Sequence, residues 1–205
     1  MPLRILTVPS SSMTDVQAED VIRLCGGVFN IDYAYLMNLC PVRTHVLGYL
    51  EDQLVAHALW LDRPMRIGNC PWFTAAYVEG VATDPDYRRL GYGEAVMRRL
   101  QDEIAGYPLG VLSPAVEPWY VRLGWERWSG TLWIDKDSVT SETLDETVLI
   151  CRTPITGVLD GVPHEVRLEW RRGEAYARLE VDLRGPRASL RCWDDRQGLL
   201  EERIV

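Results

Sequence analysis

The sequence lacks an apolar run of about eighteen residues, and this absence excludes a transmembrane helix. Residues 1–8 have neither the long apolar core nor the small-residue cleavage site of a signal peptide, so we expect a cytoplasmic protein without a membrane partner. The five cysteines and three histidines are scattered, and none stand at zinc-ligand spacing. We therefore expect no metal site, and thiols that stay free in a reducing compartment.

Positive charge is also in short supply. The formal net charge is −8, from 22 Lys and Arg against 30 Asp and Glu. Nucleic-acid binding depends on clustered basic residues, so we expect no nucleic-acid partner. An acidic protein attracts cationic small molecules, but mild acidity also simply keeps a protein in solution. Charge alone does not decide between these two readings.

The hydrophobic pattern predicts an α/β protein with a mixed sheet and helices packed on it. Strands are predicted over residues 1–8, 44–50, 53–61, 71–83, 109–112, 125–134 and 146–151, and helices over residues 14–25, 32–38, 89–105 and 118–123. Thr14 and Gln17 form a capping-box pattern at the start of the first helix, which we expect to end at Gly26-Gly27.

The texture of the sequence changes after Pro163. Residues 165–170 and 175–183 alternate polar and apolar side chains, which predicts a terminal hairpin or an extension at the sheet edge. We divide the chain into a domain over residues 1–163 and an extension over residues 164–205, which belongs to the same domain or to a dimer interface. Residues 186–205 carry no clear pattern.

The most informative segment lies between the strand that ends near Thr83 and the helix that follows it. Here Arg88, Gly91 and Gly93 form an R-x-x-G-x-G pattern. A helix start offers unpaired N–H groups, glycines allow close approach of the backbone, and arginine adds charge-assisted hydrogen bonds. The pattern therefore predicts a pyrophosphate site. It is not a Walker loop, because no Gly-Lys-Ser/Thr follows, and Val96 replaces the third glycine of a dinucleotide fingerprint.

Two motifs resemble those of the GNAT superfamily of acetyl-CoA-dependent N-acetyltransferases. Val81 to Gly93 fits V-x-x-x-P-x-x-R-x-x-G-x-G, and Trp119 to Trp125 fits an aromatic-Tyr helix that ends in R-x-G-aromatic. The sequence is most similar within that superfamily to the aminoglycoside 2'-N-acetyltransferases. The segments that carry this resemblance are residues 27–33, 77–82, 109–113, 124–128 and 170–174.

The resemblance implies a mostly antiparallel mixed sheet, splayed where acetyl-CoA binds, and a homodimer. It implies that Glu79 is the catalytic base, directly or through water, and that Tyr120 protonates the departing thiolate. Glu79 also stands out in its own right, as an acid inside an apolar strand, and the adjacent Gly80 predicts a bulge. The residues assigned to acetyl-CoA are Val81, Thr83, Arg88, Arg89, Gly91 and Gly93.

For the acceptor, the resemblance implies a small, cationic amine held by carboxylates and hydroxyls. The assigned residues are Asp32, Ser113, Asp145 and Glu174, each of which is equally ordinary as a solvated polar residue. The sequence runs on past Tyr176, unlike that family, so kasugamycin joins the candidate acceptors. The leading hypothesis is an N-acetyltransferase that confers aminoglycoside resistance. The alternatives are a GNAT enzyme for another small amine or a peptide, and an acyl-CoA-binding sensor without turnover.

Overall fold

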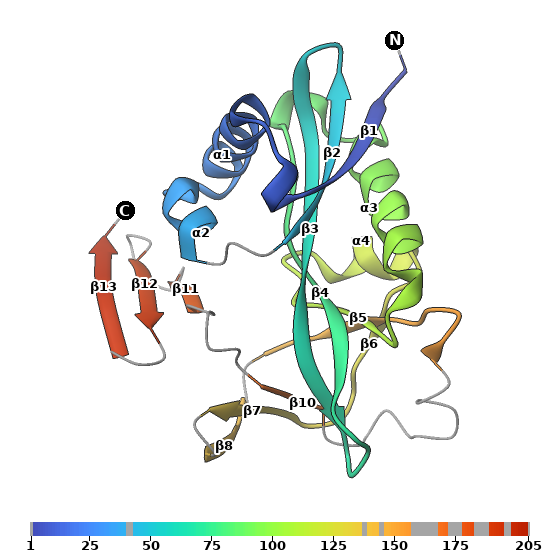
Figure 1. Cartoon of the computed structure of the whole chain (residues 1–205), viewed down its shortest axis with the longest axis vertical. Coiled ribbons are helices and arrows are strands. Elements are labelled where there is room, and N and C mark those ends of the chain that lie inside the picture. The colour runs from blue at the N-terminus through green and yellow to red at the C-terminus, as the bar shows by residue number, and fades with distance from the viewer. Residues whose placement is uncertain are drawn as a thin grey trace.

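The structure, a computed structural model, describes residues 2–39, 43–136, 139–143, 146–156, 168–171, 178–182, 189–194 and 198–204. Within them, a ten-stranded mixed sheet carries helices on both faces, which confirms the predicted fold class (Figure 1). Its strands are β1 (Arg4–Pro9), β2 (Thr44–Leu50), β3 (Gln53–Ile67), β4 (Phe73–Thr83), β5 (Gly110–Leu112), β6 (Glu126–Arg127), β7 (Leu132–Lys136), β8 (Val139–Glu142), β9 (Leu149–Cys151) and β10 (Leu168–Arg171). The helices are α1 (Asp15–Phe29), α2 (Tyr33–Leu39), α3 (Tyr92–Glu103) and α4 (Glu117–Arg122).

The sheet is mostly antiparallel. Its order is β6-β9-β5-β4-β3-β10-β7-β8, with β2 also paired to β3 and β1 paired to β2. Only the β4–β5 and β10–β7 pairs of the described strands are parallel. The long strands β3 and β4 run down the middle of the molecule (Figure 1), so β4 reaches both the helices and the far end of the sheet.

The two faces of the sheet are covered by different helices, because side chains alternate along each strand. Val46 of β2 packs with Val96 and Leu100 of α3, whereas the next residue, Leu47, packs with Val21 of α1. Figure 1 shows α1 and α2 on one side and α3 and α4 on the other. In β4 the residues from Ala75 to Val78 are buried between these layers, whereas Glu79 to Val81 are only partly buried.

The first helix begins as predicted and ends later than predicted. Thr14 accepts from the Gln17 N–H while the Gln17 side chain accepts from Thr14, so the capping box is confirmed. The predicted end at Gly26-Gly27 is wrong, because α1 continues to Phe29 and ends at Asn30 with φ of 56°. Val28 packs against the core beneath α1, and this packing outweighs the low helix propensity of two glycines.

Two strand predictions are also wrong. Residues 125–134 are two strands rather than one, since β6 pairs with β9 while β7 pairs with β8 and β10. The backbone N–H of Trp128 donates to the Val148 carbonyl and extends the β6–β9 pairing by one residue, and the chain leaves this ladder before β7 begins at Leu132. Residues 165–170 and 175–183 do not pair as a hairpin in the described segments. Instead β10 lies between β3 and β7 in the large sheet.

The described C-terminal strands form a second, three-stranded antiparallel sheet. They are β11 (Arg178–Asp182), β12 (Ser189–Asp194) and β13 (Gly198–Ile204), in that order. The proposed division into residues 1–163 and 164–205 stays a prediction. Among the residues that the structure describes, no helix is long and apolar enough to cross a membrane.

Candidate active site

Strand β4 carries a bulge at Gly80, as the sequence predicts. The pairing of β3 with β4 shifts register between His57 and Leu59, and Gly80 has φ of +60°. The extra residue shifts the alternation of side chains by one. Glu79 therefore lies on the same face as Tyr77, while Val81 packs against the α3 side of the sheet. The bulge separates the candidate base from the candidate acetyl-CoA residues.

Strands β4 and β5 separate just before this bulge. Their parallel pairing is limited to Ala76 with Gly110 and Tyr77 with Val111. From residue 78 to Thr83, the edge of β4 that faces away from β3 has no partner strand in the described part of the chain. The free edge includes the backbone of Val81 and Thr83, two of the residues assigned to acetyl-CoA. An extended amide chain pairs with such an edge as a strand would.

The turn after β4 is organised by its own backbone and side chains. Asp84 accepts from the Asp86 N–H at the start of a 3-10 turn (Pro85–Tyr87), and Arg88 Nε donates to the Thr83 carbonyl at 3.2 Å. Arg89 has φ of 65° and Gly91 has φ of 87°. Two left-handed residues this close turn the chain sharply into α3, and both arginine side chains stay exposed.

The start of α3 is held tightly against the end of β4. A Cβ at Gly93 would lie 2.6 Å from Thr83 Oγ1 and 3.6 Å from the Trp119 ring. Only glycine fits this approach, which brings β4, α3 and α4 to one point. Gly91, the N-cap of α3, has no side chain with which to cap the helix. The first N–H groups of α3 thus keep the anion-binding capacity that the sequence predicts.

Glu79 lies beside a buried arginine. Arg63 of β3 is only 8% exposed as a side chain, its guanidinium stacks over the Tyr77 ring at 3.6 Å, and it approaches Glu79 Oε1 at 4.0 Å. The Glu79 side chain is 39% exposed, so its carboxylate remains open to solvent or a ligand. Sequence reasoning missed Arg63; the signal for it was a charged residue in a strand with an apolar face.

A second carboxylate, that of Glu146, lies on the same side of the site, which we call the acceptor wall. Ser113, which follows β5, donates to Glu146 Oε1 and the Thr147 carbonyl, each at 3.1 Å. The charges of both carboxylates act on Tyr77, whose pKa is raised first by burial and also by Glu79 and Glu146. Sequence reasoning chose Asp145 and missed Glu146, one residue further on. The spacing of an irregular loop gave no signal to distinguish them.

Tyr120 lies in α4, beside the start of α3. Its ring packs edge-on against Trp119 at 4.8 Å and Trp125 at 6.4 Å. Burial raises the pKa of Tyr120 to about 12, and no hydrogen bond of its hydroxyl is formed within the described residues. A buried, protonated hydroxyl without a protein acceptor is available to donate a proton to a ligand atom.

Of the remaining acceptor residues, Asp32 alone is among the residues that the structure describes. Asp32 is exposed, and its Oδ1 accepts from the Tyr35 N–H at 3.0 Å, which makes it the cap of α2. Asp145 and Glu174 lie outside the described residues. The structure therefore gives Asp32 a local structural contact, and the roles of all three at an acceptor stay predictions.

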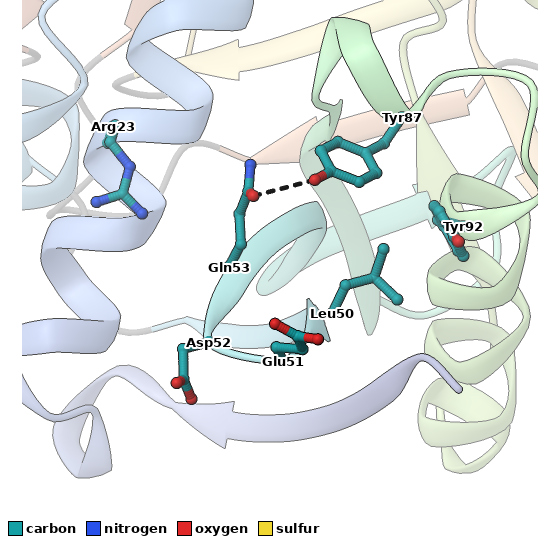
Figure 2. A pocket seen from close by; sticks show the side chains of 7 residues that line it. All are labelled: Arg23, Leu50, Glu51, Asp52, Gln53, Tyr87 and Tyr92. Carbon is teal, nitrogen blue, oxygen red and sulfur yellow. Dashed lines mark hydrogen bonds between the residues drawn. The ribbon is translucent and has the colours of Figure 1, made fainter. Parts of the chain in front are cut away.

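An open pocket of about 570 Å³ lies on the other side of the phosphate turn (Figure 2). Tyr87 and Tyr92 meet the β2–β3 turn there, and the Tyr87 hydroxyl donates to Gln53 Oε1 at 3.1 Å. None of the residues assigned to the acetyl-CoA or acceptor sites lines this pocket. Its volume reflects the gap between the turn and α1, so we do not place the reaction in it.

Comparisons with known proteins support one family. The sequence profile of the acetyltransferase (GNAT) domain matches residues 11–128. The chain is 27% identical over 144 residues to an aminoglycoside 2'-N-acetyltransferase of Mycolicibacterium fortuitum, a match that covers 64% of this chain and 73% of the relative.

Solved structures share the fold at low identity. A GNAT family N-acetyltransferase (YhbS) of Escherichia coli, in complex with CoA, matches with a TM-score of 0.57 and 14% identity over 83% of this chain and 91% of that chain. A GCN5-related N-acetyltransferase of Kribbella flavida matches with a TM-score of 0.52 and 24% identity over 63% of this chain, which spans only 35% of that protein. The profile covers more than half of the sequence, and the protein belongs to the GNAT acetyltransferase family.

Proposed function

We propose that this GNAT enzyme acetylates an amine of an aminoglycoside, at the 2' position. The observation that carries the proposal is the placement of Glu79: an accessible carboxylate at a bulge, beside the free edge of β4. The choice of acceptor is supported by the Mycolicibacterium fortuitum relative, which is an aminoglycoside 2'-N-acetyltransferase. A proton acceptor beside an amide-binding edge suits attack of an amine on a thioester.

In this proposal the coenzyme lies along the free edge of β4. The N–H groups of Val81 and Thr83 bind the pantetheine arm, since no strand competes for them in the described residues. The backbone N–H groups around Gly91 and Gly93 and the arginines Arg88 and Arg89 bind the pyrophosphate. The left-handed turn and the uncapped helix start suit an anion of this size.

Glu79 accepts the proton of the substrate ammonium, directly or through one water. The freed amine nitrogen forms a bond to the thioester carbonyl carbon. The nitrogen then loses its second proton to water, and the carbon–sulfur bond breaks to release the amide and the thiolate. Arg63 beside Glu79 fixes the carboxylate and compensates its charge before the proton arrives. Backbone N–H groups of the β4 edge stabilise the oxyanion while it exists.

Tyr120 completes the reaction by donating its hydroxyl proton to the departing thiolate. With a pKa of about 12, the Tyr120 hydroxyl is protonated at neutral pH and is a weaker acid than a thiol, whose pKa is about 8.5. It donates a hydrogen bond to the sulfur as negative charge develops there. The proton passes to the sulfur along this hydrogen bond, and reprotonation of the tyrosinate from solvent drives the transfer to completion.

The acceptor wall supplies hydrogen-bond acceptors for a cationic sugar. Ser113 and Glu146 lie together at one wall, while Asp32 lies on the α2 side. Asp145 and Glu174 remain the further proposed contacts. The carboxylates of Glu79 and Glu146 favour a cationic substrate, because an ammonium group of the acceptor gains a charge-assisted hydrogen bond from each carboxylate that it meets.

The deciding experiment is a thiol-release assay with acetyl-CoA against aminoglycosides, kasugamycin, polyamines and basic peptides. Thiol release with an aminoglycoside, and a product one acetyl group heavier at N2', supports the proposal. Turnover of polyamines or peptides alone replaces it with a GNAT enzyme for another amine. Silence across the panel, while acetyl-CoA still raises the melting temperature, replaces it with an acyl-CoA sensor.

Two further expectations stay predictions. Size-exclusion chromatography with light scattering tests the homodimer, because a monomer has a mass of 23.4 kDa. Cell fractionation tests the cytoplasmic location. A role in resistance is tested by expressing the protein in a sensitive strain. If every aminoglycoside inhibits the growth of this strain as strongly as it inhibits the parent strain, the protein does not confer resistance.

A further inference from the structure

A chain of buried side chains connects the surface to the bulge at Gly80. Ser10 Oγ lies 3.1 Å from His45 Nε2, His45 Nδ1 lies 2.9 Å from His57 Nε2, and His57 Nδ1 lies 2.7 Å from the Gly80 carbonyl. The exposed fractions of His45 and His57 are 0% and 1%. Both histidines belong to the face that α1 covers, and the mechanism proposed above does not use them.

The carbonyl at the end of this chain fixes the direction of every hydrogen bond. A carbonyl only accepts, so His57 carries its proton on Nδ1 and accepts on Nε2. His45 must then donate from Nδ1, which leaves its Nε2 to accept from the Ser10 hydroxyl. The Ser10 hydroxyl has two acceptors within reach, because its Oγ also lies 3.1 Å from the Arg43 carbonyl, and the acceptor that His45 offers completes this chain.

The surroundings keep this pair of histidines uncharged. Burial lowers the pKa of His57 to about 4, and burial followed by the charges of His57 and Arg43 lowers that of His45 to about 2. At neutral pH the pair is a neutral hydrogen-bond relay with one arrangement of protons. It adds no charge beside Glu79, and it fixes geometry instead.

The geometry that it fixes is that of the bulge. His57 stands on β3 where the register with β4 shifts, and its ring lies against Gly80 on one side. A Cβ at Gly80 would lie 3.2 Å from His57 Cε1 and 2.5 Å from the Tyr33 hydroxyl. Gly80 is thus clamped between two side chains, while Glu79 and Val81 flank it in the chain.

We propose that His57 is a positioning residue, which holds the Gly80 carbonyl and thereby sets the positions of Glu79 and the Val81 N–H, and that His45 fixes its tautomer. The catalytic part of this inference rests on the proposed function, because it concerns the same base and thioester site. Without His45, His57 can place its proton on Nε2. Its Nδ1 then accepts from the Cys25 thiol, 3.3 Å away, and repels the Gly80 carbonyl.

The experiment compares His57→Leu, which cannot donate, with His57→Asn, whose Nδ2 stands where Nδ1 stands. We expect kcat to fall about a hundredfold in the Leu variant, since small displacements of reacting groups cost that much. We expect the Kd for CoA to change little, because the phosphate turn is intact. The Asn variant should recover most of the lost kcat, and His45→Leu should lie between the two.

The control is Tyr49→Phe, which removes another buried hydrogen bond under α1, from the Tyr49 hydroxyl to Asp20 at 3.0 Å. It should lose stability as the Leu variant does and keep its kcat. Nitrogen NMR of the wild-type protein should find the His57 proton on Nδ1. The amide resonances of Gly80 and Val81 should shift in the Leu variant and return to their wild-type positions in the Asn variant. This readout does not depend on which amine the enzyme acetylates.

Three results overturn the proposal: a wild-type proton on Nε2 of His57, wild-type kcat in the Leu variant, or equal impairment of the Leu and Asn variants. An inactive wild-type protein would count against the proposed function alone. In that case the tautomer and the Gly80 and Val81 resonances still decide whether His57 holds the bulge.

Discussion

The two halves of the proposed site on β4 are built in different ways. The phosphate half is continuous in sequence, running from Thr83 to Gly93, and its conformation is set by contacts between near neighbours in the chain. The acceptor half joins side chains from separate elements, with Arg63 on β3, Glu79 on β4 and Glu146 ahead of β9. The first half depends on local conformation, whereas the second depends on the tertiary fold. Variants should therefore separate coenzyme binding from turnover.

The largest effect is expected from Glu79→Gln. Loss of the proton acceptor should lower kcat roughly 100- to 10,000-fold, while the Kd for CoA stays as in the wild type. Thiol-release kinetics measure kcat, and titration calorimetry measures the Kd for CoA. Glu126→Gln is the matched control, because Glu126 is also 39% exposed and paired with an arginine, Arg152 at 3.0 Å. Equal activity of the two variants would remove Glu79 from the mechanism.

A smaller effect in the opposite half is expected from Gly93→Ala. The new Cβ would meet Thr83 Oγ1 at 2.6 Å and push α3 away from β4. Overpacking of this kind costs about 1–3 kcal/mol, so the Kd for CoA should rise about tenfold or more. The double variant with Thr83→Ala should recover part of the affinity. A double variant no better than the single one would mean that the steric contact is not the cause.

Arg63→Met tests whether the acceptor half depends on tertiary placement. The change keeps much of the side-chain volume, and it removes the cation from beside Glu79 and from the Tyr77 ring. We expect kcat/KM for the amine to fall about tenfold, as for loss of a positioned partner, and the Kd for CoA to stay constant. Arg152→Met, in the surface pair, should change neither. A lower KM for the amine in the variant would instead mean that Arg63 repels the cationic acceptor in the wild-type protein.

The difference between local and tertiary contacts also explains which features could be predicted from the sequence. The phosphate turn, the capping box at Thr14 and the bulge at Gly80 depend on residues that are neighbours in the chain, so local rules suffice. Arg63 and Glu146 could not be placed at the site, since nothing local indicates which residues will meet across a sheet. In the same way the insertion of β10 between β3 and β7 joins segments far apart in sequence.

The helix end and the histidines illustrate the limit further. Two glycines at 26 and 27 predict a helix end by propensity, but packing of Val28 carries α1 past them. In the sequence, His57 is an isolated polar residue in an apolar strand. Its proposed role depends on contacts with His45, Gly80 and Cys25, which are far from it in the chain and could not be predicted. Polar residues in buried strands are therefore informative only once their partners are known.

The last effect is on stability rather than on turnover, and it comes from the titration of the buried pair His45 and His57 in acid. An unfolded histidine binds a proton with a pKa near 6.5, whereas burial lowers the pKa of His57 to about 4 and that of His45 to about 2. Below pH 6.5 the unfolded chain thus binds more protons, and the free energy of unfolding falls by about 1.4 kcal/mol per pH unit for each histidine until the folded-state pKa is reached.

His57→Asn removes one of these groups and keeps the donor to Gly80. Urea unfolding between pH 6.5 and 4.5 should therefore give a shallower slope for the variant, with the carboxylate contribution common to both proteins. Parallel slopes would mean that the pKa of His57 is the same in the folded and the unfolded chain.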